Sequence, residues 1–249
     1  MQQRRRSWVL ALALVFAAGA VIGSRSGDDG NAATPGPSPA QHVKNTRPAY
    51  APPRTPPIHW RASRSLGTPT EGRLVRAVHL PAEGADFVTW HPVTDRRPNA
   101  SARRWSSRRL VRTLLVVVRA HRLAHPDAPR VVVGDLSLRR GGRFPPDDDE
   151  EGTHASHQNG LDVDVYLPRR DRRLRPPLRR AQIDRALAQD LVDRFVAAGA
   201  QRVFVSRRLR MRGPRNVVQH WPRHGDHLHV RLPARDLAQH DEVRRADRA

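Results

Sequence analysis

Apolar residues recur at a helical spacing in two stretches of the chain. Residues 104–125 place aliphatic side chains three and four positions apart and end before Pro126, which predicts a helix packed against a core. Residues 183–198 repeat this spacing and end before Gly199, a residue that commonly caps a helix. The pattern therefore predicts two amphipathic helices.

Shorter apolar segments around these helices are typical of β-strands. The expected strands are residues 74–80, 87–90, 130–138, 161–167, 203–205 and 227–232. The clearest alternation lies in residues 161–167, where Asp162, Asp164 and Tyr166 alternate with aliphatic residues. Strands combined with two helices predict an α+β fold, in which a small mixed or antiparallel sheet carries helices on one side.

The segments outside this pattern predict an exported protein. Residues 1–23 begin with arginines and continue with an apolar run of about fifteen residues, as an export signal does. This run is short for a spanning helix, which needs about 20 residues, so both cleavage and retention as an N-terminal membrane anchor stay open. Residues 24–64, rich in proline and alanine, predict a disordered tether. The folded domain is expected at 65–235, with a charged tail at 236–249.

Composition narrows the classes of function. The formal charge is +21, and Lys44 is the only lysine among 45 basic residues. These residues are spread along the whole chain and aromatic residues make up only 5%, so no specific nucleic-acid surface is indicated. The chain has no cysteine. Disulfides, thiolate zinc sites and cysteine nucleophiles are therefore excluded.

Histidines and aspartates gather in two segments, residues 152–164 (GTHASHQNGLDVD) and 220–232 (HWPRHGDHLHVRL). Together these segments hold six of the thirteen histidines. Imidazole and carboxylate groups are ligands that zinc prefers in proteins. The two segments are therefore the candidate halves of one metal site.

Spacing within the two segments predicts which side chains share a face. Residues two apart on a strand point the same way, so His227 and His229 face one cleft, as do Asp162 and Asp164. One member of each pair can be a ligand and the other a near neighbour. A catalytic zinc site needs three protein ligands and an open position, which His157, Asp164 and His229 would provide.

Other hydrolytic chemistries lack their motifs in this sequence. No H-E-x-x-H or G-x-S-x-G occurs, and Gln41 stands where an S-x-x-K motif ending at Lys44 would need serine. The segment from His91 to Asp95 superficially resembles the first motif of lysostaphin-like zinc endopeptidases, but the glycine between its ligands is missing. We interpret His91 as part of a surface turn. Metal-assisted hydrolysis remains.

Several motifs resemble those of the penicillin-insensitive murein endopeptidase family. The segment SHQNGLDVD at residues 156–164 resembles the family's S-H-Q-x-G-L-D-x-D, and His224-x-x-His227-x-His229 resembles its terminal histidine cluster. Further similarities are Gly134–Ser137 and Gly141-Gly142 before the first motif, and Ser65–Gly67 with Gly72–Leu74 at the domain start. The resemblance covers residues 65–232.

This resemblance implies a fold, an activity and a location. The fold would be the small α+β one shared with D-alanyl-D-alanine dipeptidases and carboxypeptidases and with hedgehog domains. The activity would be zinc-dependent hydrolysis of the D-alanyl cross-link in peptidoglycan, so a peptidoglycan peptide is the expected substrate. The expected location is periplasmic or otherwise extracytoplasmic, at the cell wall.

The resemblance also assigns roles to individual residues. One catalytic zinc ion would bind His157, Asp164 and His229, and His227 would be the base or the stabiliser of the transition state. The auxiliary ligands or cleft residues would be His154, His224 and Asp162, the last as a hydrogen-bonding neighbour. Asp226 and His220 are expected to be solvated or to contact ligand residues.

Two alternative functions stay open at this point. One is a D,D- or L,D-carboxypeptidase of the same fold, and the other is a non-catalytic zinc module that binds cell-wall polymer. An open coordination position beside His227 favours an enzyme, whereas a fourth fixed ligand favours the module. The acidic segment 144–151 (FPPDDDEE) departs from the family pattern, which leaves the bond specificity open.

Overall fold

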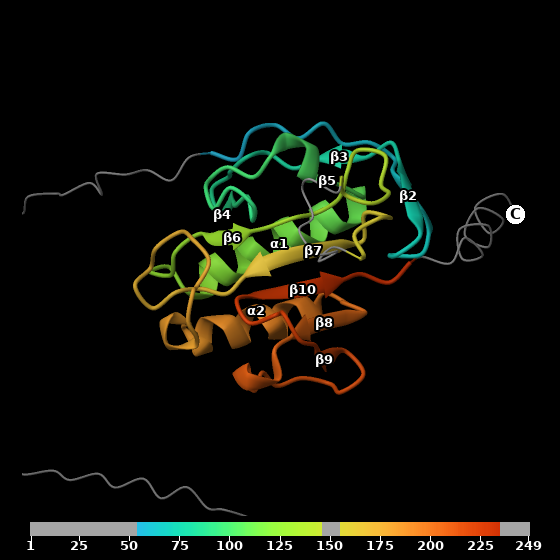
Figure 1. Cartoon of the computed structure of the whole chain (residues 1–249). Coiled ribbons are helices and arrows are strands. Elements are labelled where there is room, and N and C mark those ends of the chain that lie inside the picture. The colour runs from blue at the N-terminus through green and yellow to red at the C-terminus, as the bar shows by residue number, and fades with distance from the viewer. Residues whose placement is uncertain (1–53, 146–154, 235–249) are drawn as a thin grey trace, which may run out of the picture. The chain divides into compact units, whose positions relative to one another are not determined.

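The computed structural model describes residues 54–145 and 155–234 (Figure 1). Within these residues, no helix combines the length and the apolar character that crossing a membrane requires. Several sequence predictions fall wholly or partly outside the described residues and stay predictions: the export signal at 1–23, most of the tether at 24–64, the acidic segment beyond residue 145, His154 and the tail at 236–249.

A six-stranded mixed sheet, in the order β4-β6-β7-β10-β8-β9, forms the centre of the described fold. Its strands are β4 (Phe87–Thr89), β6 (Val131–Val133), β7 (Asp162–Tyr166), β8 (Arg202–Val205), β9 (Val218–His220) and β10 (His227–Arg231). The central strands β6, β7, β10 and β8 pair antiparallel, whereas β4 and β9 pair parallel to their neighbours at the two edges. The predicted α+β class is confirmed.

Two helices, α1 (Arg108–Ala124) and α2 (Arg185–Ala197), lie side by side along this sheet (Figure 1). The side chains of Ser107 and Asp184 cap their N-termini by accepting hydrogen bonds from backbone N–H groups of the first turn. Gly199 follows α2 with a φ of 80°, the conformation expected of a glycine after a helix. Side chains thus satisfy free backbone N–H groups where the helices begin, and backbone N–H groups of His125 and Ala198 bond to carbonyls where they end.

The alternation in β7 and β10 directs aliphatic side chains toward the helices. One buried core joins strand residues to helix residues: Val163, Val165, Leu228 and Val230 with Leu110, Leu114, Leu191 and Phe195. Each buried aliphatic side chain contributes about 1.5–3 kcal/mol, and a one-residue slip would move charged residues into this core. The packing therefore holds the polar residues of β7 and β10 on the opposite face of the sheet.

Smaller elements surround the sheet. Two short ladders pair β1 (Arg64–Gly67) with β2 (Gly72–Val75) and β3 (Val78–His79) with β5 (Trp105–Ser106). Single 3₁₀ turns are η1 (Ser101–Arg103), η3 (Arg180–Gln182) and η4 (Arg207–Leu209). Strands β1, β5 and β9 escape a periodicity analysis because each has only two to four residues.

The structure corrects three predicted boundaries. Residues 74–80 do not form one strand, because Arg76 has a φ of 54°, a left-handed conformation that interrupts a strand. Residues 130–138 are a strand only at Val131–Val133, since the chain then turns away and Asp135 pairs with a buried arginine. The first helix begins at Arg108 rather than at residue 104, because Ser107 caps it.

Candidate metal centre

The register of β7 against β10 brings a carboxylate and an imidazole face to face. His229 lies directly opposite Asp164, and His227 lies opposite Tyr166. The Nδ1 atom of His229 is 3.1 Å from Oδ1 of Asp164. Directly opposed residues of an antiparallel pair have their side chains in contact, so the strand pairing alone joins two of the expected ligands.

His157 reaches the same point from the loop that precedes β7. Its φ of 71° is unusual for a residue with a side chain, and its backbone N–H donates to the Asp162 carboxylate at 3.3 Å. Its Nδ1 lies 2.5 Å from the carbonyl oxygen of Leu136. A carbonyl only accepts, so Nδ1 carries the proton. A neutral His157 therefore presents the lone pair of Nε2, which lies 3.5 Å from Oδ2 of Asp164.

These three residues form a compact donor group. His157, Asp164 and His229 each offer one ligand atom, and these atoms lie within 4.8 Å of one another. All three side chains belong to buried residues, exposed by only 1%, 6% and 6%. Two imidazoles and one carboxylate match the donor set of catalytic zinc sites. The structure thus brings together the triad that the sequence analysis names.

Asp162 lies behind this group. It is fully buried, and its Oδ1 accepts hydrogen bonds from Nε2 of His229 at 3.0 Å and from Nε of Arg231 at 2.6 Å. Holding the far nitrogen of His229 turns its Nδ1 toward Asp164, which is how carboxylates orient metal-binding histidines. Of the two aspartates on this strand face, Asp164 contacts the histidines, and Asp162 positions His229.

His227 points one nitrogen at Asp164 and the other at its neighbour in the sequence. Its Nε2 lies 3.8 Å from Oδ1 of Asp164, and its Nδ1 lies 2.8 Å from Oδ1 of Asp226. An ionised carboxylate only accepts, so Nδ1 donates and a neutral ring leaves Nε2 free to take up a proton. The sequence analysis gave Asp226 no specific role. Its position directly before His227 was the signal available.

Two further aromatic side chains border the group. The His224 ring centroid is 4.9 Å from that of His227 and 5.7 Å from that of His229, so the expected cleft histidine does lie here. Its Nδ1 donates to the carbonyl of Pro222 at 2.8 Å. The Tyr166 ring lies 5.9 Å from the His227 ring. The sequence analysis placed Tyr166 on this strand face but assigned it no role.

Other histidines of the motif segments and of the rejected motif lie elsewhere. His220 is exposed at the end of β9. His91 forms an antiparallel bridge with Arg96 across residues 92–95, a turn as interpreted from the sequence.

Phe144, the first residue of the acidic segment, is buried, and its ring lies 6.2 Å from the ring of His157.

The pKa shifts within the ligand group indicate that its carboxylates stabilise positive charge at this point. Burial would raise the pKa of Asp164, but His157 and His227 hold that pKa well below its usual range. Burial would lower the pKa of His229, yet contacts with Asp162 and Asp164 raise it to about 9. Buried carboxylates that keep neighbouring imidazoles protonated can also stabilise a divalent cation in place of those protons. The residues present therefore fit a zinc ion.

The surroundings shift the pKa values of His227 and His224 in opposite directions. Burial opposes the charged form of His227, but Asp164 and Asp226 raise its pKa above the ordinary value. Burial, with a smaller effect of the charge of His227, lowers the pKa of His224 to about 4. His224 is thus neutral at pH 7, whereas His227 can hold a proton near neutrality.

Comparisons with known proteins agree on one family. A model of the penicillin-insensitive murein endopeptidase family matches residues 65–211, a range that includes His157 and Asp164 and ends before β10. Proteins named penicillin-insensitive murein endopeptidase from Salmonella heidelberg (strain SL476), Salmonella paratyphi B and Salmonella newport are each 29% identical to this chain over 217 positions. These alignments cover 73% of the chain and 71% of each relative.

Proposed function

The chain belongs to the penicillin-insensitive murein endopeptidase family, a family of metallopeptidases, and we propose that it hydrolyses D-alanyl cross-links of peptidoglycan with one zinc ion held by His157, Asp164 and His229. Membership makes the chain a peptidase of the murein endopeptidase type. The bond, the metal and the ligand residues are the parts that we propose.

One observation carries the ligand assignment. The antiparallel register sets His229 opposite Asp164, and the loop before β7 adds His157, so that three buried donors converge. The proton on Nδ1 of His157 is held by the Leu136 carbonyl, and Nε2 of His229 is held by Asp162. Each histidine therefore has one nitrogen fixed by the protein and the other turned to the common point, as metal-binding histidines do.

The remaining residues supply proton transfer. When bound, zinc would supply a Lewis acid, which would polarise the scissile carbonyl and lower the pKa of the attacking water. His227 accepts the proton of the attacking water at Nε2 and returns it to the leaving amine. Asp226 fixes the tautomer of His227 and stabilises its charged form through Nδ1. A covalent acyl-enzyme is not needed.

The substrate defines where the protein works. A murein endopeptidase acts on the cell wall, which lies outside the cytoplasm. We therefore propose that residues 1–23 direct export and that the proline- and alanine-rich stretch before β1 links this segment to the folded domain.

The test is digestion of purified peptidoglycan with identification of the products by mass spectrometry. We expect cross-linked muropeptide dimers to be converted into monomers, with no release of free D-alanine. Release of D-alanine without loss of dimers would indicate a carboxypeptidase instead, and binding without any product would indicate a non-catalytic module. His157→Ala is the inactive control, and exposed His220→Gln is the matched substitution that should digest normally.

A further inference from the structure

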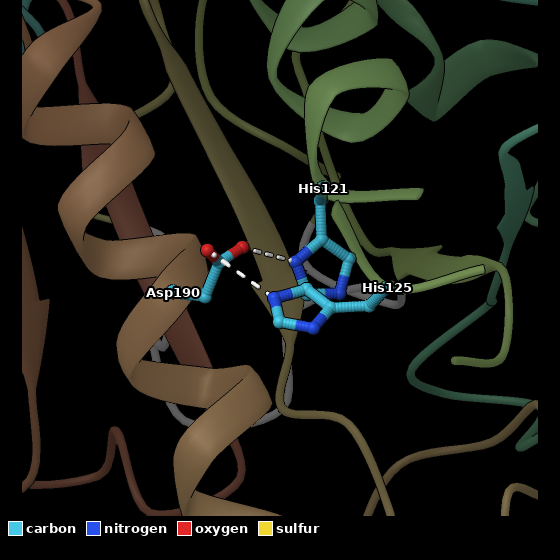
Figure 2. A group of neighbouring side chains, drawn as sticks. All are labelled: His121, His125 and Asp190. Carbon is cyan, nitrogen blue, oxygen red and sulfur yellow. Dashed lines mark hydrogen bonds and ion pairs between the residues drawn. The ribbon is translucent and has the colours of Figure 1, made fainter. Parts of the chain in front are cut away.

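A second group of two histidines and a carboxylate lies between the two helices (Figure 2). His121 is in the last turn of α1, His125 is the capping residue directly after this helix, and Asp190 is in the middle of α2. The helices pack on the face of the sheet that carries the aliphatic core, whereas the ligand group of β7 and β10 lies on the other face. The two groups are thus separated by the sheet.

Nitrogen and oxygen atoms of this group converge as ligand atoms do. Residues four apart on a helix share a face, which sets both imidazoles toward α2, with ring centroids 5.1 Å apart. Nδ1 of His121 lies 2.6 Å from Oδ2 of Asp190, and Nε2 of His125 lies 3.3 Å from Oδ1. One ligand atom from each residue lies within 4.8 Å of the others.

Each contact between an imidazole nitrogen and the Asp190 carboxylate needs a proton or a metal cation between its two atoms. Imidazole nitrogens without a proton and carboxylate oxygens both carry lone pairs, so each contact requires either a proton or a cation. His121 is fully buried, so its 2.6 Å contact with Asp190 is closed to solvent and holds either a proton or a cation. Nε2 of His125 is buried, and its 3.3 Å contact with Oδ1 of Asp190 does not have the geometry of a hydrogen bond.

Arg194 contacts the same carboxylate. Its Nε lies 2.6 Å from Oδ2 and its Nη2 lies 2.9 Å from Oδ1 of Asp190. This pairing orients the carboxylate toward α1, as outer partners orient ligand carboxylates. It also places a positive charge beside the group. A cation would therefore bind here more weakly than among the buried donors on the other face, and without a cation the same contacts form an ion pair between the helices.

We propose that His121, His125 and Asp190 form a second divalent-metal site, suited to zinc or cobalt, that joins α1 to α2. Two imidazoles and one carboxylate are a donor set of zinc. The side chains of His125 and Asp190 are 35% and 22% exposed, so an ion can enter from solvent. Because both helices contribute ligands, binding would stabilise their packing.

The site is tested in the full chain after removal of the other metal group. In the double variant His157→Ala, His229→Ala, we expect one equivalent of zinc, measured by elemental analysis after gel filtration, and a rise in Tm on zinc addition. The unsubstituted chain should hold two equivalents. Cobalt bound to the double variant should give the visible absorption of a low-symmetry site with nitrogen ligands. These outcomes do not depend on whether the enzyme cleaves peptidoglycan.

Substitutions in the double variant identify the ligands. His125→Gln should lose the bound equivalent and the rise in Tm, and Asp190→Asn should do the same, while His220→Gln should keep both. His125 and Asp190 are chosen because they are partly exposed, and circular dichroism confirms the fold of each variant. A folded double variant that binds no zinc, or one whose zinc is unaffected by both substitutions, would overturn the proposal and leave an ion pair between helices.

Discussion

The Nδ1 atom of His227 lies 2.8 Å from Oδ1 of Asp226, the residue directly before it in the chain. This contact fixes the proton of His227 on the side away from the ligand group. The opposite nitrogen then faces Asp164 at 3.8 Å, too far for a direct hydrogen bond. The pair therefore separates the histidine that we propose to move protons from the histidines that we propose to hold the metal.

His227→Ala should retain near-full zinc content while kcat falls by about 10²–10⁴, the usual contribution of a positioned acid–base group. The reason is that His227 reaches the reacting water without being one of the three converging ligands. Zinc content and turnover are measured on the same preparation. Parallel loss of zinc would make His227 a ligand, and retention of full turnover would remove it from the mechanism.

Asp226→Asn should reduce kcat by about 10- to 100-fold, as loss of a residue that orients a functional histidine does. Because the Asp226 carboxylate raises the pKa of His227, the acidic limb of the pH–rate profile should also move to lower pH in the variant. Asp95→Asn, at an exposed aspartate, is the control. A lower kcat with an unchanged acidic limb of the pH–rate profile would mean that Asp226 only holds the loop in place.

Chelation should abolish peptidoglycan hydrolysis, and zinc should restore it. His157→Ala should fail to recover on zinc addition, because two remaining donors hold the ion too weakly. β-Lactams should have no effect, since the sequence has no serine–lysine or cysteine nucleophile motif. Elemental analysis measures the zinc content, and a muropeptide assay measures peptidoglycan hydrolysis. Inhibition by penicillin would contradict the metal mechanism.

Asp135→Ala should lower the free energy of unfolding by about 3–5 kcal/mol, the cost of leaving a buried charge without its partner. Asp135 accepts hydrogen bonds from Arg103 at 2.5 Å and from Asn99 at 2.8 Å, and the side chains of Asp135 and Arg103 are at most 1% exposed. Denaturant unfolding measures the change. The exposed Asp127→Ala should stay within about 0.5 kcal/mol of the unsubstituted chain, and equal effects of the two changes would contradict the argument.

Asp190 should make stability depend on acid pH. Burial opposes its charged form, but hydrogen bonds from Arg194 and His121 lower the pKa of Asp190 to about 2, below the usual value of about 3.9. A depressed folded pKa adds stability above the unfolded pKa, and this stability is lost as pH falls toward the folded pKa. With a chelator present, the Tm difference between the unsubstituted chain and Asp190→Asn should be largest above about pH 5 and shrink toward pH 2.

Asp193→Asn, an exposed aspartate on the same helix, serves as the control for this pH series. Its Tm difference from the unsubstituted chain should change little over the same range. A difference for Asp190→Asn that stays constant with pH would show that the carboxylate is not stabilised by its partners.

Local periodicity was enough to predict the main elements of this chain. Helical spacing identified α1 and α2, and alternation identified β7 and β10, because each pattern depends only on which neighbours in the sequence share a face. The same rule placed Asp162 with Asp164 and His227 with His229. The candidate chemistry could therefore be named from residue types and spacing.

Tertiary structure decided what each of these side chains faces. Alternation cannot distinguish Asp162 from Asp164, and it is the pairing of β7 with β10 that sets His229 opposite Asp164. The left-handed turn at Arg76 and the arginine pair of Asp135 likewise arise from distant contacts. His121 and Asp190 lie 69 residues apart, and only the packing of α1 on α2 brings their side chains together. Sequence spacing describes one element at a time, whereas a site built from several elements depends on how they pack.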